Sequence, residues 1–413
     1  MSQSSRAVLF LPPSAHPDAS RVFIARALRA FGDGFVSILL PVYLLGLGFD
    51  PIEVGVLTTA TLLGSAAITM AVGLMAHRAR LRTLLLLASA LMIFTGLGFA
   101  WFQSFWPLLV VAFVGTLNPS SGDVSMFLPL EHAALAHSVA DKDRTSLFAR
   151  YSLIGALMGA LGTLCAGAPD LLGAKFGFTP VRAMQIMFLV YGLLGFLAMF
   201  AYWNVQQSRT SDNNQAPAPL GPSRKIVYWL AALFSVDAFG GGFIVQSMLA
   251  LWLFQRFELS LSEAATIFFW SNILTAISYF AAVSLSRRFG LINTMVFTHL
   301  PSSACLIIMP FVSQLWLVLT LLFVRSLLSQ MDVPTRTSYV MAVVTPPERP
   351  AAASITAVPR SLAAALSPSF AGLLLSVTTF GWPLLFGGVL KIGYDLALLF
   401  MFRGVLPPEE RKK

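Results

Sequence analysis

Charged side chains stand inside several long apolar stretches of this sequence. Arg29 precedes Asp33 by four residues in the first stretch, and Asp237 stands at a similar depth in a later one. Residues four apart share one face of a helix, so Arg29 and Asp33 are expected to be neighbours. Burial disfavours a charged carboxyl group and a nearby arginine favours it, so a group under both influences can gain and lose a proton. We interpret Asp33, Asp237 and Arg29 as candidates for proton transfer, with a static Arg29–Asp33 ion pair as the alternative.

A second group of residues could contact a bound molecule. Arg325 is a lone base about ten residues into an apolar stretch, roughly 15 Å along a helix. It would either hold an anionic group or neutralise Asp33 or Asp237. The other candidates are Gln246, Phe35, Trp252 and Asn118. The aromatic candidates favour an amphipathic molecule and the arginine favours an anion, so the identity of the molecule stays open.

Five further ionisable residues receive structural interpretations. Lys391 and Asp395 are four residues apart and are expected to neutralise each other on one helix. Glu131 and His132 are expected at the interfacial end of a helix, with a proton relay as the alternative. His299 is expected to be a buried packing residue.

The composition identifies the apolar stretches as membrane-spanning helices. Of 413 residues, 57% are hydrophobic and only 11% are charged, whereas ordinary globular domains carry roughly 25% charged residues. A bilayer core needs roughly 20 apolar residues per helix. We therefore predict an all-α membrane protein with twelve transmembrane helices in two pseudo-symmetric six-helix bundles. The predicted spans are about 22–47, 52–76, 83–103, 107–135, 149–168, 183–203, 225–253, 262–285, 291–312, 315–343, 360–379 and 382–402.

The distribution of basic residues predicts the orientation in the membrane. Most lysines and arginines outside the spans fall on the side that carries both termini. Basic loops stay cytoplasmic, so we predict cytoplasmic termini in a multi-pass protein of the plasma (inner) membrane. The net charge of +9 is then explained by topology, and no nucleic-acid partner is expected.

Several other classes of protein are disfavoured. The cysteines, Cys165 and Cys305, are too few for a disulfide framework or a zinc cluster. The sequence has neither a phosphate-binding Gly-x₄-Gly-Lys-Ser/Thr loop nor a Gly-x-Ser-x-Gly elbow. We therefore expect no metal, no cofactor and no enzymatic activity.

The chain contains an internal repeat at an offset of about 209 residues. Phe31–Phe35 (FGDGF) aligns with Phe239–Phe243 (FGGGF), and Asp123-Val124 aligns with Asp332-Val333. Repeats in like orientation are typical of one large transporter fold. We predict an N-terminal half at 1–203, a cytoplasmic linker at 204–225 and a C-terminal half at 226–413.

The loop between the second and third spans carries a resemblance to a known family. Its sequence, GLMAHRARLR, resembles the Gly-x₃-Asp-Arg-x-Gly-Arg-Arg/Lys loop of the major facilitator superfamily. It keeps Gly73, Arg78 and Arg82, with His77 in place of the Asp and Arg80 in place of the second Gly. The resemblance extends over essentially the whole chain. It implies secondary active transport by alternating access, with spans one, four, seven and ten lining a central cavity.

The resemblance also implies a cytoplasmic gate. In the superfamily an acid on span four closes this gate against the loop arginine. Asp123 with Arg78 or Arg82 would form one latch, and Asp332 with Arg288 would form the equivalent latch in the second half. A static anchor, such as Asp332 pairing with Arg336 one turn along its own helix, is the alternative.

The fifth span bears on the direction of transport. Gly155, Gly159 and Gly162 resemble the glycine spacing of an antiporter motif, with Ala160 where the motif has a proline. Helix packing alone would also explain them. We expect a monomeric, proton-coupled exporter of a small organic molecule. An uptake symporter or facilitator of the same fold is the first alternative, and a non-transporting membrane sensor or scaffold is the second.

Overall fold

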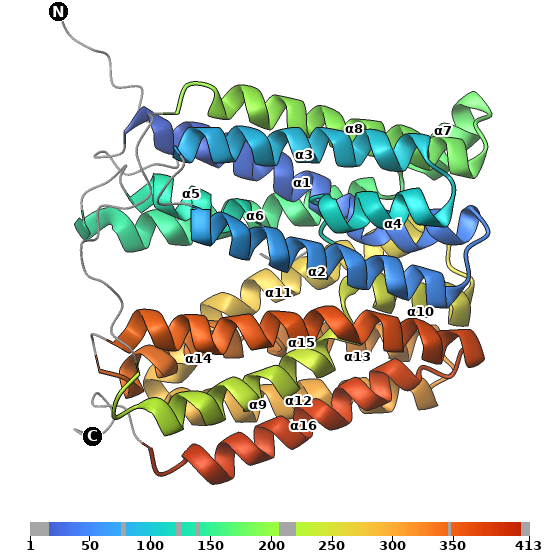
Figure 1. Ribbon diagram of the computed structural model, residues 1–413. Helices are drawn as coiled ribbons and strands as arrows, with labels where there is room; N and C mark the ends of the chain where they lie inside the picture. Colours follow the sequence, from blue (N-terminus) through green and yellow to red (C-terminus); the bar gives the residue numbers. More distant parts are fainter. Residues whose placement is uncertain are drawn as a thin grey trace, which may run out of the picture.

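The computed structural model describes residues 16–75, 80–120, 126–136, 141–205, 220–345 and 348–405, and this part of the chain is built of helices (Figure 1). The first half contains α1 (Pro17–Gly46), α2 (Pro51–Met75), α3 (Leu81–Trp101), α4 (Phe105–Val114), α5 (Phe127–Ala136), α6 (Asp141–Cys165), α7 (Ala168–Phe176) and α8 (Pro180–Tyr202). The second half contains α9 (Arg224–Gly242), α10 (Gln246–Phe257), α11 (Leu261–Phe289), α12 (Leu291–Ile308), a 3₁₀ turn (Met309–Phe311), α13 (Leu315–Leu328), α14 (Asp332–Val343), α15 (Arg349–Val377) and α16 (Trp382–Phe402).

The helices form two bundles that lie one above the other in Figure 1, with both chain ends at the left. Within the described residues, nine segments are long and apolar enough to cross a membrane. The fold is the predicted all-α membrane architecture. The twelve predicted spans fit it when α4 with α5, α9 with α10, and α13 with α14 are each counted as one interrupted span.

Those three interruptions were not predicted. Helix α4 ends at Val114, the N–H of the next residue, Gly115, still bonds to the Val111 carbonyl, and Pro119 follows without an N–H to donate. Helix α9 ends in the triplet Gly240–Gly242, which has the least tendency of any residue type except proline to continue a helix. Pro334 lies in the first turn of α14, a position where a proline is tolerated. Broken helices at membrane depth occur where the backbone lines a cavity or is buried in protein.

The start of the eleventh span also differs from the prediction. Helix α15 begins at Arg349, eleven residues before the predicted boundary at 360. The helix continues through Pro359 without ending, since a packed helix can accommodate a proline as a kink. Arg360 therefore lies inside a membrane helix and not in a basic loop.

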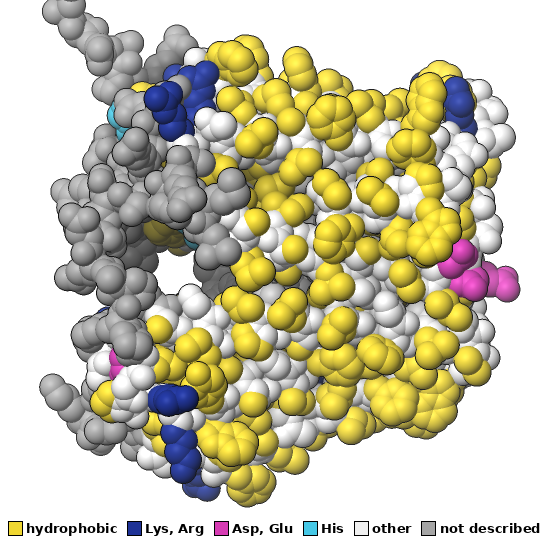
Figure 2. Space-filling view, in the orientation of Figure 1, with side chains coloured by type: hydrophobic (Ala, Val, Ile, Leu, Met, Phe, Trp, Pro, Cys, Tyr) yellow, Lys and Arg dark blue, Asp and Glu magenta, His cyan; other side chains and the backbone are white. Residues whose placement is uncertain are grey.

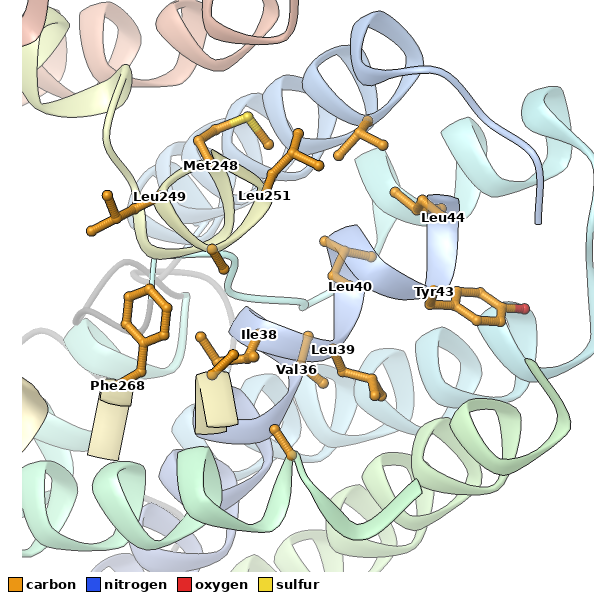
Figure 3. Packing of buried hydrophobic residues seen from close by; sticks show 14 of the residues in the cluster. Val36, Ile38, Leu39, Leu40, Tyr43, Leu44, Met248, Leu249, Leu251 and Phe268 are labelled. Carbon is orange, nitrogen blue, oxygen red and sulfur yellow. The ribbon is translucent and has the colours of Figure 1, made fainter. Parts of the chain in front are cut away.

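Among the described residues, the two bundles share one hydrophobic core at the end opposite the termini. There, residues of α1 such as Leu40 and Leu44 belong to the same buried cluster as Met248 and Leu251 of α10 and Phe268 of α11 (Figure 3). At the end that carries the termini, each half has a separate core, one around Phe23 and the other around Phe234.

The outer surface of the protein is apolar in the middle and charged at the ends. Figure 2 shows hydrophobic side chains across the middle of the face, with basic side chains toward its two ends. The described residues of the two halves thus share a core at one end, which we call the closed end, and pack in separate cores at the other, as in one state of an alternating-access cycle.

Candidate functional site

A buried carboxylate on α9 binds cations from two other helices. Asp237 is only 4% exposed. Lys391 Nζ on α16 donates to Asp237 Oδ1 at 2.7 Å, and Arg336 Nη1 on α14 donates to Oδ2 at 3.1 Å. Asp237 was predicted to be a midplane acid, but neither of these cations was predicted as its partner.

His299 on α12 lies between this carboxylate and a second one. Its Nδ1 atom is 3.0 Å from both carboxylate oxygens of Asp395 on α16. Its Nε2 atom is 3.8 Å from Asp237 Oδ1 and 3.5 Å from Lys391 Nζ. The predicted Lys391–Asp395 pair is therefore wrong, because α9 and α12 bring closer partners to both residues. His299 is buried and packed against Tyr394, as expected, and it also links two acids.

Asp332, the third acid of this region, pairs with Arg336 on its own helix, α14. Arg336 Nη1 lies 3.3 Å from Asp332 Oδ2, four residues away. Arg288, the predicted gate partner of Asp332, is exposed with its guanidinium 5.4 Å from the ring centre of Phe289. The structure thus contains the static pairing that was the alternative. We call Asp237, His299, Asp332, Arg336, Lys391 and Asp395 the C-half charge cluster.

The N-terminal half holds a smaller buried group around Arg29. Its guanidinium donates to Glu131 on α5, which is fully buried. The hydroxyl groups of Tyr151 on α6 and Tyr202 on α8 donate to the same carboxylate. The interfacial placement of Glu131 is therefore wrong. A signal was available, because Glu131 is the one acid in the apolar segment Phe127–Ala136.

Asp33 lies one turn beyond Arg29 and is half-buried. It is close enough to Arg29 and Tyr191 to interact with both electrostatically. The described ion-pair partner of Arg29 is Glu131, and Asp33 adds an electrostatic interaction with the same arginine.

The two halves carry related pairs with reversed charge. Arg29 and Asp237 are equivalent by the internal repeat. Arg29 pairs with an acid on the fourth span of its half, Glu131, and Asp237 pairs with a base on the equivalent span, Arg336. Each pair joins the first and fourth spans of a bundle, so each resists their separation.

The residues predicted to line a cavity lie in different environments. Gln246 Nε2 on α10 donates to Ser37 Oγ on α1 at 3.1 Å and so joins the two halves. Asn118 is buried in the break after α4, and its Oδ1 accepts from Ser120 Oγ at 2.7 Å. Arg325 has a buried Nε atom without a hydrogen-bond partner among the described residues. It does not pair with Asp237, which is held by other cations.

Phe35 and Trp252 do not line an open cavity in this structure. Both side chains are fully buried. Phe35 packs edge-on against Tyr191, and Trp252 Nε1 donates to the Thr379 carbonyl at 3.2 Å. Their large apolar surfaces are used for packing at the closed end.

The predicted N-half gate falls largely outside the described residues. Arg78 and Asp123 lie outside them, and Gly73 lies in the last turns of α2. The Arg82 guanidinium lies 5.3 Å from the ring centre of Trp203. The roles of these residues as a gate stay predictions.

The closed end has its own inter-half contacts. Asp170 Oδ2 on α7 accepts from the backbone N–H of Ser262 at 2.9 Å and from its hydroxyl at 2.7 Å, at the start of α11. Helices α2 and α15 cross so closely that a Cβ on Gly55 would lie 2.5 Å from the Pro368 carbonyl oxygen. This seam must open if the protein is to expose the opposite side.

The glycines of the fifth span are used for packing. A Cβ on Gly162 would lie 1.9 Å from the Phe31 carbonyl oxygen on α1, and Gly159 contributes its own carbonyl to a similar approach at Gly34. Close packing therefore accounts for Gly159 and Gly162, and an antiporter role of this span stays a prediction.

Two helical bundles, closed at one end and each holding buried charge, define a membrane transporter that works by alternating access. The sequence model of the Major Facilitator Superfamily matches residues 22–300 and again 230–413, and the chain belongs to this superfamily. It is accordingly a transporter and not an enzyme, and it resides in a lipid bilayer.

Individual relatives agree with this assignment. An uncharacterised membrane protein of Saccharomyces cerevisiae is 24% identical over 427 aligned residues, which cover 95% of each chain. The solved nucleoside transporter NupG has the same fold, with a TM-score of 0.72 at 12% identity over 94% of this chain and 100% of that one. A bacterial homologue of the iron transporter ferroportin, in an inward-facing state, gives 0.70 at 16% identity over 92% and 98%.

Proposed function

We propose that this transporter exports a small organic molecule in exchange for protons, and that the C-half charge cluster couples the two movements. The observation that carries the proposal is the position of His299, between Asp237 and Asp395 and beside Lys391. Ionisable groups at membrane depth are costly and are typical of proton pathways. Histidine is the side chain whose charge ordinarily changes between about pH 5 and 8.

The geometry supports a specific sequence of events. While His299 is neutral, Lys391 and Arg336 neutralise Asp237 and join α16 and α14 to α9. A proton on His299 places a further positive charge beside Asp237. Asp237 is then neutralised even when its contact with Lys391 is broken, so this contact is easier to break. Because α9 leads into α10, which packs against α1 at the closed end, a change in how α9 is held would bias that end toward opening (Figure 3).

Asp33 is the second candidate for coupling. It is half-buried on α1, the helix that packs against α10 at the closed end. Protonation of Asp33 would act on Arg29 and thereby on the Arg29–Glu131 pair. Arg325 is the candidate to contact an anionic group of the substrate.

The proposed orientation is compatible with export. If the basic loops are cytoplasmic, the end with the separate cores faces the cytoplasm, and an exporter loads its substrate there. Uptake by symport would use the same cluster with the opposite net flux, so a direct assay of flux decides between them.

The proposal is tested by reconstituting the protein in vesicles that contain a pH-sensitive dye and screening drugs, sugars and organic anions. We expect at least one compound to move together with a proton signal. Asp237→Asn or Asp33→Asn should abolish the proton signal while substrate still binds. Movement of a compound without any proton signal in the native protein would show a facilitator instead.

A further inference from the structure

A hollow of about 620 Å³ lies at the end of α9 that faces the termini. It is lined by Gly221, Pro222, Arg224, Lys225, Tyr228 and Trp229. The membrane-spanning segment that contains α9 begins at Arg224, so the hollow lies where a membrane helix meets the level of the lipid headgroups. It is remote in sequence from the C-half charge cluster, since Asp237 lies almost four helical turns further on.

Two basic and two aromatic side chains make the surface of this hollow. Arg224 and Lys225 are both exposed. The Arg224 guanidinium lies 5.7 Å from the ring centre of Tyr228. Tyr228 is 51% exposed and Trp229 is 49% exposed. Basic side chains attract a phosphate group, and amphipathic rings prefer the boundary between headgroups and acyl chains.

The exposed face continues along the helix toward the middle of the membrane. Beyond Trp229, the exposed residues of α9 are Ala232 and Val236, spaced three and four apart and therefore on one face. Positive charge thus stands at the headgroup end of an uninterrupted apolar strip. A soluble anion would use only the charged end of this surface, whereas a phospholipid would use both parts.

The nearest carboxylate does not oppose an anion here. Glu348 is only 3% exposed. It accepts hydrogen bonds from the Gly221 N–H, the Ser223 hydroxyl and the Thr345 hydroxyl. Its charge is therefore satisfied beneath the hollow, and the open surface is left basic.

We propose that this hollow binds an anionic phospholipid. The phosphate group lies against Arg224 and Lys225, and an acyl chain follows Tyr228, Trp229 and the exposed face of α9. The bound lipid fixes the end of α9 at headgroup level. Each basic side chain near an anionic headgroup contributes about a fivefold preference over a zwitterionic one.

The fluorescence of Trp229 reports lipid binding in the hollow directly. The native protein and Trp229→Phe are reconstituted in phosphatidylcholine vesicles that contain increasing amounts of brominated phosphatidylglycerol or brominated phosphatidylcholine. The difference in fluorescence between the two proteins isolates Trp229. We expect half-maximal quenching of Trp229 at about 25-fold lower content of the brominated phosphatidylglycerol, since two basic side chains each contribute about fivefold. Equal quenching by the two lipids would overturn the proposal.

Variants of Arg224 and Lys225 test whether these two side chains bind the lipid. The double variant Arg224→Gln/Lys225→Gln should lower the preference for phosphatidylglycerol over phosphatidylcholine to about one. The double variant Arg224→Lys/Lys225→Arg keeps both charges and should retain the preference. Lys175→Gln, at the opposite end of the bundle and 5.7 Å from the Phe176 ring centre, is the matched control and should change nothing. Retention of the preference in the double glutamine variant would overturn the proposal. So would displacement of the lipid by excess glycerol phosphate, which would assign the site to a soluble phosphate.

Discussion

The ammonium nitrogen of Lys391 on α16 lies 2.7 Å from Asp237 Oδ1 on α9, although Asp395 stands only four residues along the same helix. The contact is a tertiary one, because it joins the first and last helices of the second half. Asp395 is held instead by His299. The energetic consequence can be measured.

A double-mutant cycle should assign the partner of Lys391. We expect Asp237→Asn and Lys391→Met to show a coupling energy of about 1–3 kcal/mol in unfolding experiments, because each removes the main partner of the other. Asp395→Asn and Lys391→Met should couple by less than about 1 kcal/mol. A larger coupling with Asp395 would contradict the ion-pair arrangement.

Glu131 should be a major determinant of stability in the N-terminal half. Glu131→Leu leaves the buried Arg29 without its anion and should lower the free energy of unfolding by about 3–5 kcal/mol. Tyr202→Phe removes one hydrogen bond to the same carboxylate and should cost only about 1–3 kcal/mol. Reversible denaturation in mixed detergent micelles measures both. Similar small effects of the two variants would mean that Glu131 is not buried with Arg29.

The Gly55 crossing should control which end of the protein is open. In Gly55→Leu the closed seam between α2 and α15 is overpacked, so the population should shift about tenfold or more toward the state open at that end. Nitroxide labels on Ile52 and Ser376, with both native cysteines replaced, report this as a longer distance. Gly393→Ala is the control, because a Cβ there meets no described atom within 4 Å. An unchanged distance in Gly55→Leu would show that the seam does not open there.

Glu348 should make stability depend on pH. Hydrogen bonds from the hydroxyl groups of Thr345 and Ser223 and the N–H of Gly221 lower the pKa of Glu348 to about 2 from its ordinary 4.5. The folded protein thus favours the ionised form. Its contribution is fully present above pH 4.5 and is lost as the pH falls toward about 2.

The measurement for Glu348 is the difference in Tm between the native protein and Glu348→Gln across this range. We expect the native protein to be more stable at neutral pH and the difference to shrink below pH 4.5. Glu258→Gln, at an exposed site, serves as the comparison. A difference that stays constant down to pH 3 would contradict the hydrogen-bonded arrangement.

Much of the fold could be predicted from the sequence, because a helix in lipid must satisfy its backbone internally and must be about 20 residues long. The breaks within the fourth, seventh and tenth spans could not. The triplet Gly240–Gly242 is visible in the sequence, yet whether a glycine triplet ends a helix depends on the neighbours that pack against it.

The candidate site was predicted only in part, for a related reason. Asp237 was identified by its depth alone. Its partners Lys391 and Arg336 come from residues 99 to 154 positions away, and no local spacing encodes such contacts. The i, i+4 rule paired Lys391 with Asp395 because it considers one helix at a time. Glu131 was misplaced because its environment is built by two tyrosines from other helices.

The most direct test of the account is the pH dependence of the Ile52–Ser376 distance in the native protein and in His299→Gln, without any substrate. His299 faces Asp395 and Lys391, Asp237 and the ring of Tyr394, with Arg336 on the far side of Asp237. We expect the population of the two states to shift with pH in the native protein. His299→Gln should remove the shift, whereas His16→Gln should retain it. An identical shift in native protein and His299→Gln would contradict a coupling role for this cluster.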